Sequence, residues 1–173
     1  MQDDDMMSMT SLLVLFSYHH HNTEKIAKVF EKVLDAPIKK PHQVSPEELE
    51  QYDLVGFGSG IYDEKHHKSV LDLAEKLPRV TDKRAFIFST CGIPSIGMNE
   101  DVVLTNHAHL RAILQSKGYV IVDEFGCVGH NTNAFLKLFG GINRGRPNAE
   151  DLERAEVFAR NLQQKLENSR TLG

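Results

Sequence analysis

A chain of 173 residues, 40% of them hydrophobic, is long enough to bury a sizeable core, and a single domain covering residues 1–173 accounts for it. The formal net charge of -4 argues against a nucleic-acid partner, because proteins that bind DNA or RNA usually present a clustered basic face. Two cysteines are too few for a disulfide scaffold or for a four-thiolate iron–sulfur cluster.

The N-terminal segment lacks the features of a targeting signal. Asp3, Asp4 and Asp5 stand where a signal peptide carries basic residues, and the apolar run that follows is short. Nothing in the sequence approaches the ~20 apolar residues that are needed to span a bilayer. We therefore expect a cytoplasmic protein without a membrane partner, in which residues 1–10 form a disordered tail.

Apolar runs alternate with helical patterns along the chain, which is typical of a parallel sheet with crossover helices. The proline-flanked strand around Ile38 is expected at or near a sheet edge, because proline cannot serve a central ladder. Together the elements predict an α/β fold, a three-layer, doubly wound, five-stranded parallel sheet of order 2-1-3-4-5. The expected strands are 12–16, the one around Ile38, 53–57, 85–88 and 119–122, and the expected helices are 24–34, 70–77, 103–114 and 149–166.

In such a sheet the ligand lies outside the carboxyl ends of the strands, so the strand-end loops belong together. The turn after the first strand, residues 17–23, carries hydroxyl, amide and imidazole groups and neither lysine nor arginine. It leads into a helix whose first N–H groups lack partners and whose dipole favours an anion. The turn therefore predicts a phosphate site in which N–H and hydroxyl groups are the donors.

Two further strand-end loops contain glycines and small polar residues. The loop at 58–63 adds the aromatic face of Tyr62, and the loop at 89–94 adds small donors beside Gly92. One phosphate turn and two loops that can flank a flat heterocycle favour flavin mononucleotide (FMN) over a dinucleotide. The glycines at 56–60 also lack the GxGxxG spacing of a dinucleotide fingerprint.

Four segments together resemble the flavodoxin family, particularly its short-chain branch: 16–27 (FSYHHHNTEKIA), 56–62 (GFGSGIY), 88–92 (FSTCG) and 140–147 (GGINRGRP). The resemblance spans about residues 12–168 and implies a flavodoxin-like fold and noncovalently bound FMN. It also implies that His21 stands where the family usually has glycine. Carried over by position, the cofactor-binding residues are Ser17, His19, His20, His21, Asn22 and Thr23 at the phosphate, and Gly60, Ile61, Tyr62, Ser89, Thr90, Cys91 and Gly92 at the isoalloxazine ring.

The nine histidines are not expected to bind a metal ion. Three adjacent side chains at 19–21 do not easily converge on one ion, and spacing such as HExxH is absent. His66 and His67 are expected to open the helix after the third strand, and no chemistry is assigned to His107 or His109.

Several residues near the expected ring site leave two interpretations open. Cys91 is expected to pack against the flavin edge, although a redox-active thiol is the alternative. Tyr62 either stacks on the ring or anchors its own loop. Asp63 and Glu64 would place negative charge near the ring, which would disfavour an anionic reduced flavin and lower its potential.

The sequence contains no Ser-His-Asp order, nucleophile elbow or P-loop, so no catalytic residue is predicted. This fits a protein whose cofactor carries the electrons. The leading prediction is an FMN-dependent, low-potential electron carrier between redox partner proteins, as a monomer or weak homodimer. The alternatives are an NAD(P)H-dependent flavin or quinone reductase on the same fold and a cofactor-free interaction or regulatory module.

Overall fold

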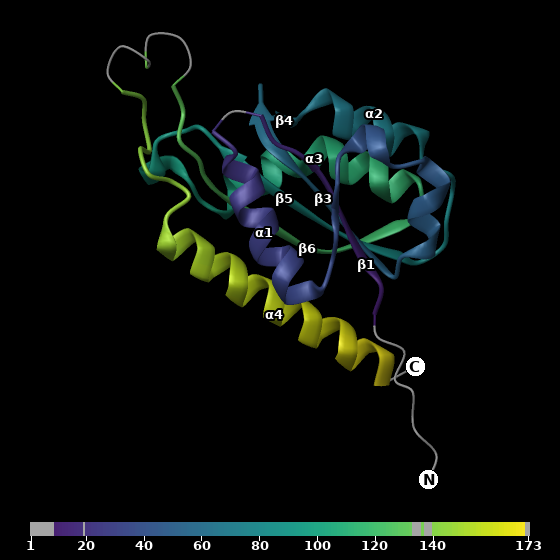
Figure 1. Ribbon diagram of the computed structural model, residues 1–173. Coiled ribbons are helices and arrows are strands. Elements are labelled where there is room, and N and C mark those ends of the chain that lie inside the picture. The colour runs from purple at the N-terminus through teal and green to yellow at the C-terminus, as the bar shows by residue number, and fades with distance from the viewer. Residues whose placement is uncertain (1–8, 19, 133–135, 137–139, 172–173) are drawn as a thin grey trace.

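The computed structural model describes residues 9–18, 20–132, 136 and 140–171, and Figure 1 shows how its elements are layered. The strands are β1 (Ser11–Phe16), β2 (Ile38–Lys39), β3 (Leu54–Tyr62), β4 (Lys65–His66), β5 (Lys83–Cys91) and β6 (Tyr119–Val128). The α-helices are α1 (Asn22–Leu34), α2 (Lys68–Lys76), α3 (Glu100–Ser116) and α4 (Ala149–Thr171), and short 3-10 helices lie at Pro41–Gln43, Pro46–Gln51 and Ser95–Gly97.

The sheet has the strand order predicted from the sequence. Five strands pair in parallel in the order β2-β1-β3-β5-β6, and the short strand β4 pairs antiparallel with β3. Numbered along the chain without β4, this order is 2-1-3-4-5, and β2 lies at the edge where the flanking prolines place it. The predicted doubly wound α/β fold is confirmed, with β4 as an addition.

Helices α1 and α4 cover one face of the sheet, and α2 and α3 cover the other (Figure 1). Alternation along β1 supplies both cores, because Leu13 belongs to the first and Leu12 to the second. In the first core, the ring of Phe30 meets the rings of Phe86, Phe88 and Phe125 edge-on, at centroid distances of 5.5, 5.2 and 5.7 Å. Helices therefore cover both faces of the sheet, and a ligand site is expected at the carboxyl ends of the strands.

β3, β5 and β6 each continue past the end predicted from the sequence. In β3, Gly58, which indicates a loop, and Gly56, which lies inside the expected strand, are both positions where aromatic rings of β5 cross the strand. A Cβ atom at Gly56 would lie 2.5 Å from the ring of Phe86, and one at Gly58 would lie 2.2 Å from the ring of Phe88. Residues 58–62 and 89–91, which were expected in strand-end loops, therefore belong to the strands β3 and β5.

A tight hairpin follows β3 and was not predicted. Asp63 and Glu64 form its turn with φ values of 47° and 59°, the left-handed pair that a two-residue hairpin needs. His66 belongs to β4 rather than to the helix, whereas His67 is the N-cap of α2, where its ring accepts a hydrogen bond from the Ser69 N–H. The expectation that both histidines open the helix is therefore wrong for His66.

Of the predicted tail at residues 1–10, the structure describes Met9 and Thr10. Met9 packs against the core, and the Thr10 N–H donates to the carboxylate of Asp53 over 2.9 Å. Within the described ranges, no helix is long and apolar enough to cross a membrane.

Candidate cofactor site

The turn between β1 and α1 is built by left-handed backbone at two histidines. His20 and His21 have φ values of 53° and 52°, and His21 is the N-cap of α1. The Ser17 hydroxyl accepts a hydrogen bond from the Glu24 N–H over 3.3 Å, which ties the start of the turn to the helix. The turn therefore presents the first N–H groups of α1 at the strand-end edge. The predicted site residue His19 lies outside the described residues.

Most of the residues predicted at the site converge on one cavity of about 70 Å³ at this edge. The cavity joins the β1–α1 turn to the ends of β3 and β5 and to the segment after β6. Its lining residues are Ser17, Tyr18, Asn22, Thr23, Gly60, Ile61, Tyr62, Thr90, Cys91, Gly92, His130 and Asn131.

The side chains of three other predicted residues point elsewhere. The Ser89 hydroxyl lies 2.8 Å from the ring of His107 in the core between β5 and α3, and the residue is 1% exposed. His21 turns outward and pairs with Glu24 over 2.6 Å. His20 does not line the cavity, but its ring contacts His130, which does.

Asn22 supplies an unsatisfied acceptor beside the cavity. Its amide nitrogen donates to the carbonyl of His130 over 2.9 Å, whereas its Oδ1 is buried with no hydrogen-bond partner. A buried acceptor of this kind costs about 1–3 kcal/mol unless a donor reaches it. The hydroxyls of Thr23 and Thr90, which both line the cavity, form a hydrogen bond with 2.8 Å between their oxygens. The donor and acceptor set is therefore neutral and suits a phosphate and hydroxyl groups.

His130 and Asn131 are lining residues that the sequence did not indicate. The Gly129 N–H donates to the carbonyl of Cys91 over 2.9 Å, and the Asn131 amide donates to the carbonyl of Gly92 over 3.0 Å. An antiparallel bridge between Asn131 and Ile142 pairs the chain after β6 with the chain that leads to α4. The strand-end rule would have found both residues if the true end of β6 had been known.

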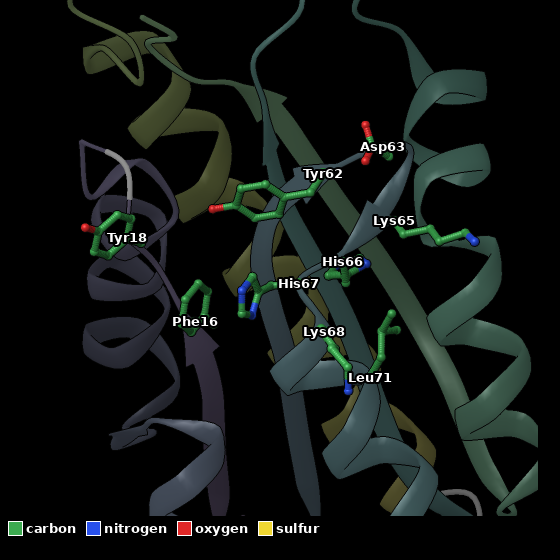
Figure 2. A pocket seen from close by; sticks show the side chains of 9 residues that line it. All are labelled: Phe16, Tyr18, Tyr62, Asp63, Lys65, His66, His67, Lys68 and Leu71. Carbon is green, nitrogen blue, oxygen red and sulfur yellow. The ribbon is translucent and has the colours of Figure 1, made fainter. Parts of the chain in front are cut away.

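A second, larger cavity of about 530 Å³ adjoins the first, and Tyr18 and Tyr62 belong to both. Figure 2 shows the rings that define it. Phe16 and His67 stack face to face with centroids 3.6 Å apart, and Tyr62 meets the edge of His67 at 5.5 Å. Burial raises the pKa of Tyr62. In this arrangement Tyr62 anchors its own hairpin and offers an aromatic wall to each cavity.

The two cysteines are buried, free thiols. Burial raises the pKa of Cys91, and it raises the pKa of Cys127 to about 12. Both side chains are therefore neutral at physiological pH, and thiolate chemistry at the cavity edge is disfavoured.

A buried polar chain underlies the site and was not recognised in the sequence. His107 bridges Ser89 and Glu124 with contacts of 2.8 Å on each side, and Arg111 holds the outer side of Glu124. The ring of His66 lies 4.9 Å from that of His107. The order resembles a Ser-His-acid triad, but Ser89 is enclosed in the core and cannot meet a substrate.

Burial and hydrogen bonds determine the protonation of these buried side chains. Burial lowers the pKa of His66 to about 3 and also lowers the pKa of His107. Burial alone would raise the pKa of Glu124, but hydrogen bonds from His107 and Arg111 lower it to about 2. Among the residues that the structure describes, no group of three or more His, Cys, Asp or Glu side chains is arranged to hold a metal ion.

Comparison with known proteins identifies the family. A family model described as a flavodoxin domain matches residues 13–118. The chain belongs to this flavodoxin family. It is also similar to an uncharacterized protein of Methanocaldococcus jannaschii, at 46% identity over 154 residues, which cover 89% of this chain and 98% of that protein.

Solved flavodoxins share the fold at low sequence identity. Oxidised flavodoxin 2 from Bacillus cereus superposes with a TM-score of 0.65 at 18% identity, covering 90% of this chain and 99% of that one. A flavodoxin from the domain Archaea gives a TM-score of 0.64 at 14% identity, covering 92% and 99%. Members of the family bind flavin, which makes flavin the cofactor class for which the site is tested.

The residues present fit a flavin that carries a phosphate. The N-terminus of α1 and the hydroxyls of Ser17 and Thr23 suit the phosphate. The unpartnered Oδ1 of Asn22 suits a hydroxyl donor on the sugar chain. The ends of β3 and β5 supply small residues and one aromatic wall, Tyr62, for a flat ring.

Proposed function

We propose that this flavodoxin-family chain binds FMN noncovalently at the strand-end cavity and carries electrons between redox partner proteins. The observation that supports the proposal is the convergence of three separate segments, 17–23, 60–62 and 90–92, on one cavity that holds an unpartnered buried acceptor on Asn22. Three segments far apart in sequence meet at the switch point of a doubly wound sheet, where such folds bind their ligands.

Each lining residue then has a defined role toward the cofactor. Ser17 and Thr23, with the first N–H groups of α1, bind the phosphate. Asn22 orients the sugar chain through its Oδ1 while its amide nitrogen holds the carbonyl of His130. Tyr62 and Cys91 border the ring, the latter as a neutral thiol. When bound, the flavin supplies one- and two-electron transfer, and the protein supplies orientation and electrostatics.

The experiment compares two asparagines in the reconstituted protein. Asn22→Ala removes the buried acceptor, and Asn161→Ala changes an exposed residue of α4 as a control. We expect Asn22→Ala to weaken FMN binding by roughly 10- to 100-fold, in line with the loss of a buried hydrogen bond, and Asn161→Ala to leave it unchanged. Equal affinities for both variants would contradict the proposed site.

A second candidate function has one specific observation in its favour. The aromatic cavity of about 530 Å³ shares Tyr18 and Tyr62 with the cofactor cavity and could seat a second flat reactant. An NAD(P)H-dependent flavin or quinone reductase would use such a space. Stopped-flow mixing of the FMN-loaded protein with NADPH separates the candidates. The carrier proposal expects no fast flavin reduction until a partner reductase is added, and fast reduction by NADPH alone would favour the enzyme.

A further inference from the structure

The described lining of the cofactor cavity contains no permanent cation that could balance a phosphate. A phosphate monoester carries about -1.5 to -2 charge at neutral pH. Among the described residues that line the cavity there is neither lysine nor arginine, and His130 is the side chain that can become cationic near neutral pH. Within the described lining, any cationic charge that compensates the phosphate beyond the helix dipole therefore comes from the imidazole of His130.

His130 is held against the phosphate turn at both main chain and ring. Its carbonyl accepts a hydrogen bond from Asn22, and its N–H donates to the carbonyl of Arg146 over 3.2 Å. Its ring lies 4.4 Å from the ring of His20, at an interplanar angle of 34°. The Nε2 of His20 lies 2.8 Å from the Thr132 hydroxyl. The two imidazoles therefore join the β1–α1 turn to the segment after β6.

The contacts of His130 indicate which nitrogen would gain a proton. Its Nε2 lies 3.3 Å from the carbonyl of Gly140, and a carbonyl can only accept, so Nε2 is the donor. In the neutral ring Nδ1 then carries no proton, and protonation converts it into a second donor. Two imidazoles in contact resist double protonation unless an anion lies beside them, because like charges repel.

The other charged groups around this pair are already engaged or exposed. His21 pairs with Glu24, and Arg146 donates to Asp151 over 2.8 Å and to Asn148 over 2.9 Å. Arg144 is exposed on the segment after β6. None of these groups lines the cavity, whereas His130 does and its ring contacts His20.

We propose that His130, stacked on His20, is a proton-linked anchor for the phosphate of FMN. Binding of FMN is coupled to uptake of a proton by His130, and the site thereby discriminates FMN from riboflavin, which lacks the phosphate. The inference rests on the proposed FMN function and adds a specificity determinant to it.

The dissociation constants of FMN and riboflavin at pH 7 and pH 9 test the proposal. The phosphate is largely dianionic at pH 7 and gains little further charge up to pH 9, whereas an imidazole loses its proton over this range. For the wild type we expect the Kd of FMN to rise by about fivefold to tenfold from pH 7 to pH 9, and the Kd of riboflavin to change by less than about twofold. Calorimetry at pH 7.5 in buffers of different ionisation enthalpy should show uptake of about half a proton to one proton per FMN.

Two variants locate the effect. His130→Phe keeps a ring against His20 but cannot take a proton, so the pH dependence of the FMN Kd should fall to that of riboflavin. His109→Phe, on the exposed surface of α3, should retain the wild-type dependence. His130→Gln repeats the test if the phenylalanine disturbs packing, and the proton uptake of the wild type needs no variant.

The outcomes separate this inference from the function on which it rests. A ratio of FMN to riboflavin affinity that does not change with pH, or proton uptake that persists in His130→Phe and His130→Gln, overturns the anchor and leaves the FMN site in place. Failure of the wild type to bind either flavin overturns both.

Discussion

At the scale of single residues, His21 shows how the phosphate turn forms without the glycine that the family usually has there. The residue adopts a φ of 52°, and its side chain turns outward to Glu24 instead of crowding the cavity. The left-handed backbone costs a non-glycine residue about 1–2 kcal/mol. His21 is therefore a stability cost rather than an obstacle to the cofactor.

Replacement of His21 by glycine should stabilise the fold without changing FMN affinity. We expect His21→Gly to raise the free energy of unfolding by about 0.5–1 kcal/mol, since relief of the left-handed strain exceeds the added freedom of the unfolded chain. Urea unfolding and flavin titration check the two parts. Lys32→Gly, inside α1, should lose about 1 kcal/mol instead. A change in FMN affinity beyond about threefold in His21→Gly would mean that the imidazole belongs to the site.

Two acidic residues at the tip of the β3–β4 hairpin provide a test of local charge. Asp63 lies at the rim of the aromatic cavity, next to Tyr62 (Figure 2). Negative charge there should disfavour electrons on the flavin. Asp63→Asn with Glu64→Gln should therefore raise the midpoint potential by tens of millivolts, on the order expected for charges near a protein surface. As a control, Glu153→Gln with Glu156→Gln on α4 should leave the midpoint potential unchanged. A potential unchanged by the hairpin substitutions would rule out the electrostatic role.

At the scale of elements, the features that the sequence did not predict are mostly the ends of the strands and the directions of the side chains there. Ser89 and Thr90 looked equivalent in a loop. Because β5 continues through both, their side chains alternate to opposite faces of the sheet, and only Thr90 reaches the cavity. The hydrophobic pattern was sufficient to predict the helices and the strand order. The end of β3 was missed because Gly58 indicates a loop, whereas here it accommodates the ring of Phe88.

Glycine at position 58 is therefore a packing requirement that can be tested. Gly58→Ala would place a Cβ 2.2 Å from the Phe88 ring, so we expect a loss of about 1–3 kcal/mol in unfolding free energy. Gly97→Ala is the control, because its Cβ would lie 3.8 Å from Ile93 and meet no clash. The double variant Gly58→Ala with Phe88→Leu should lose less than the sum of its parts. Full additivity would show that the ring and the glycine do not interact.

The buried histidines between β4, β5 and α3 make stability depend on pH. His66 has a folded pKa of about 3, below the ordinary value of about 6.5, and the folded pKa of His107 is also lowered. As pH falls below about 6.5, His66 and His107 bind protons in the unfolded chain but stay neutral in the folded chain. The free energy of unfolding therefore decreases with acidification. Above that pH both states carry neutral rings, and this contribution is flat.

Urea unfolding between pH 7 and pH 6 isolates the histidine contribution, because this window lies above both the unfolded pKa of Glu124, about 4.5, and its folded pKa, about 2. His66→Gln should reduce the slope by up to about 1.4 kcal/mol per pH unit, which corresponds to one proton. His109→Gln, which alters an exposed histidine, should keep the wild-type slope. Equal slopes in wild type and His66→Gln would contradict a buried neutral ring at position 66.

At the scale of the whole molecule, the site is made by topology rather than by any one motif. Three segments that the sequence singled out meet at the carboxyl edge of the sheet, and a fourth, at 129–131, joins them from beyond β6. The sequence singles out no lining residue in that fourth segment, because its position depends on where β6 ends and on the bridge between Asn131 and Ile142. The fold was predictable from periodicity, whereas the closure of the site depends on long-range contacts.

Titration of the purified, flavin-free protein with FMN is the measurement that tests this account most directly. The account predicts saturable binding of one FMN per chain, with flavin fluorescence quenched as the ring packs against Tyr62 and Cys91, and weaker binding by Asn22→Ala. Flavin fluorescence and absorbance that remain those of free FMN throughout the titration would contradict it.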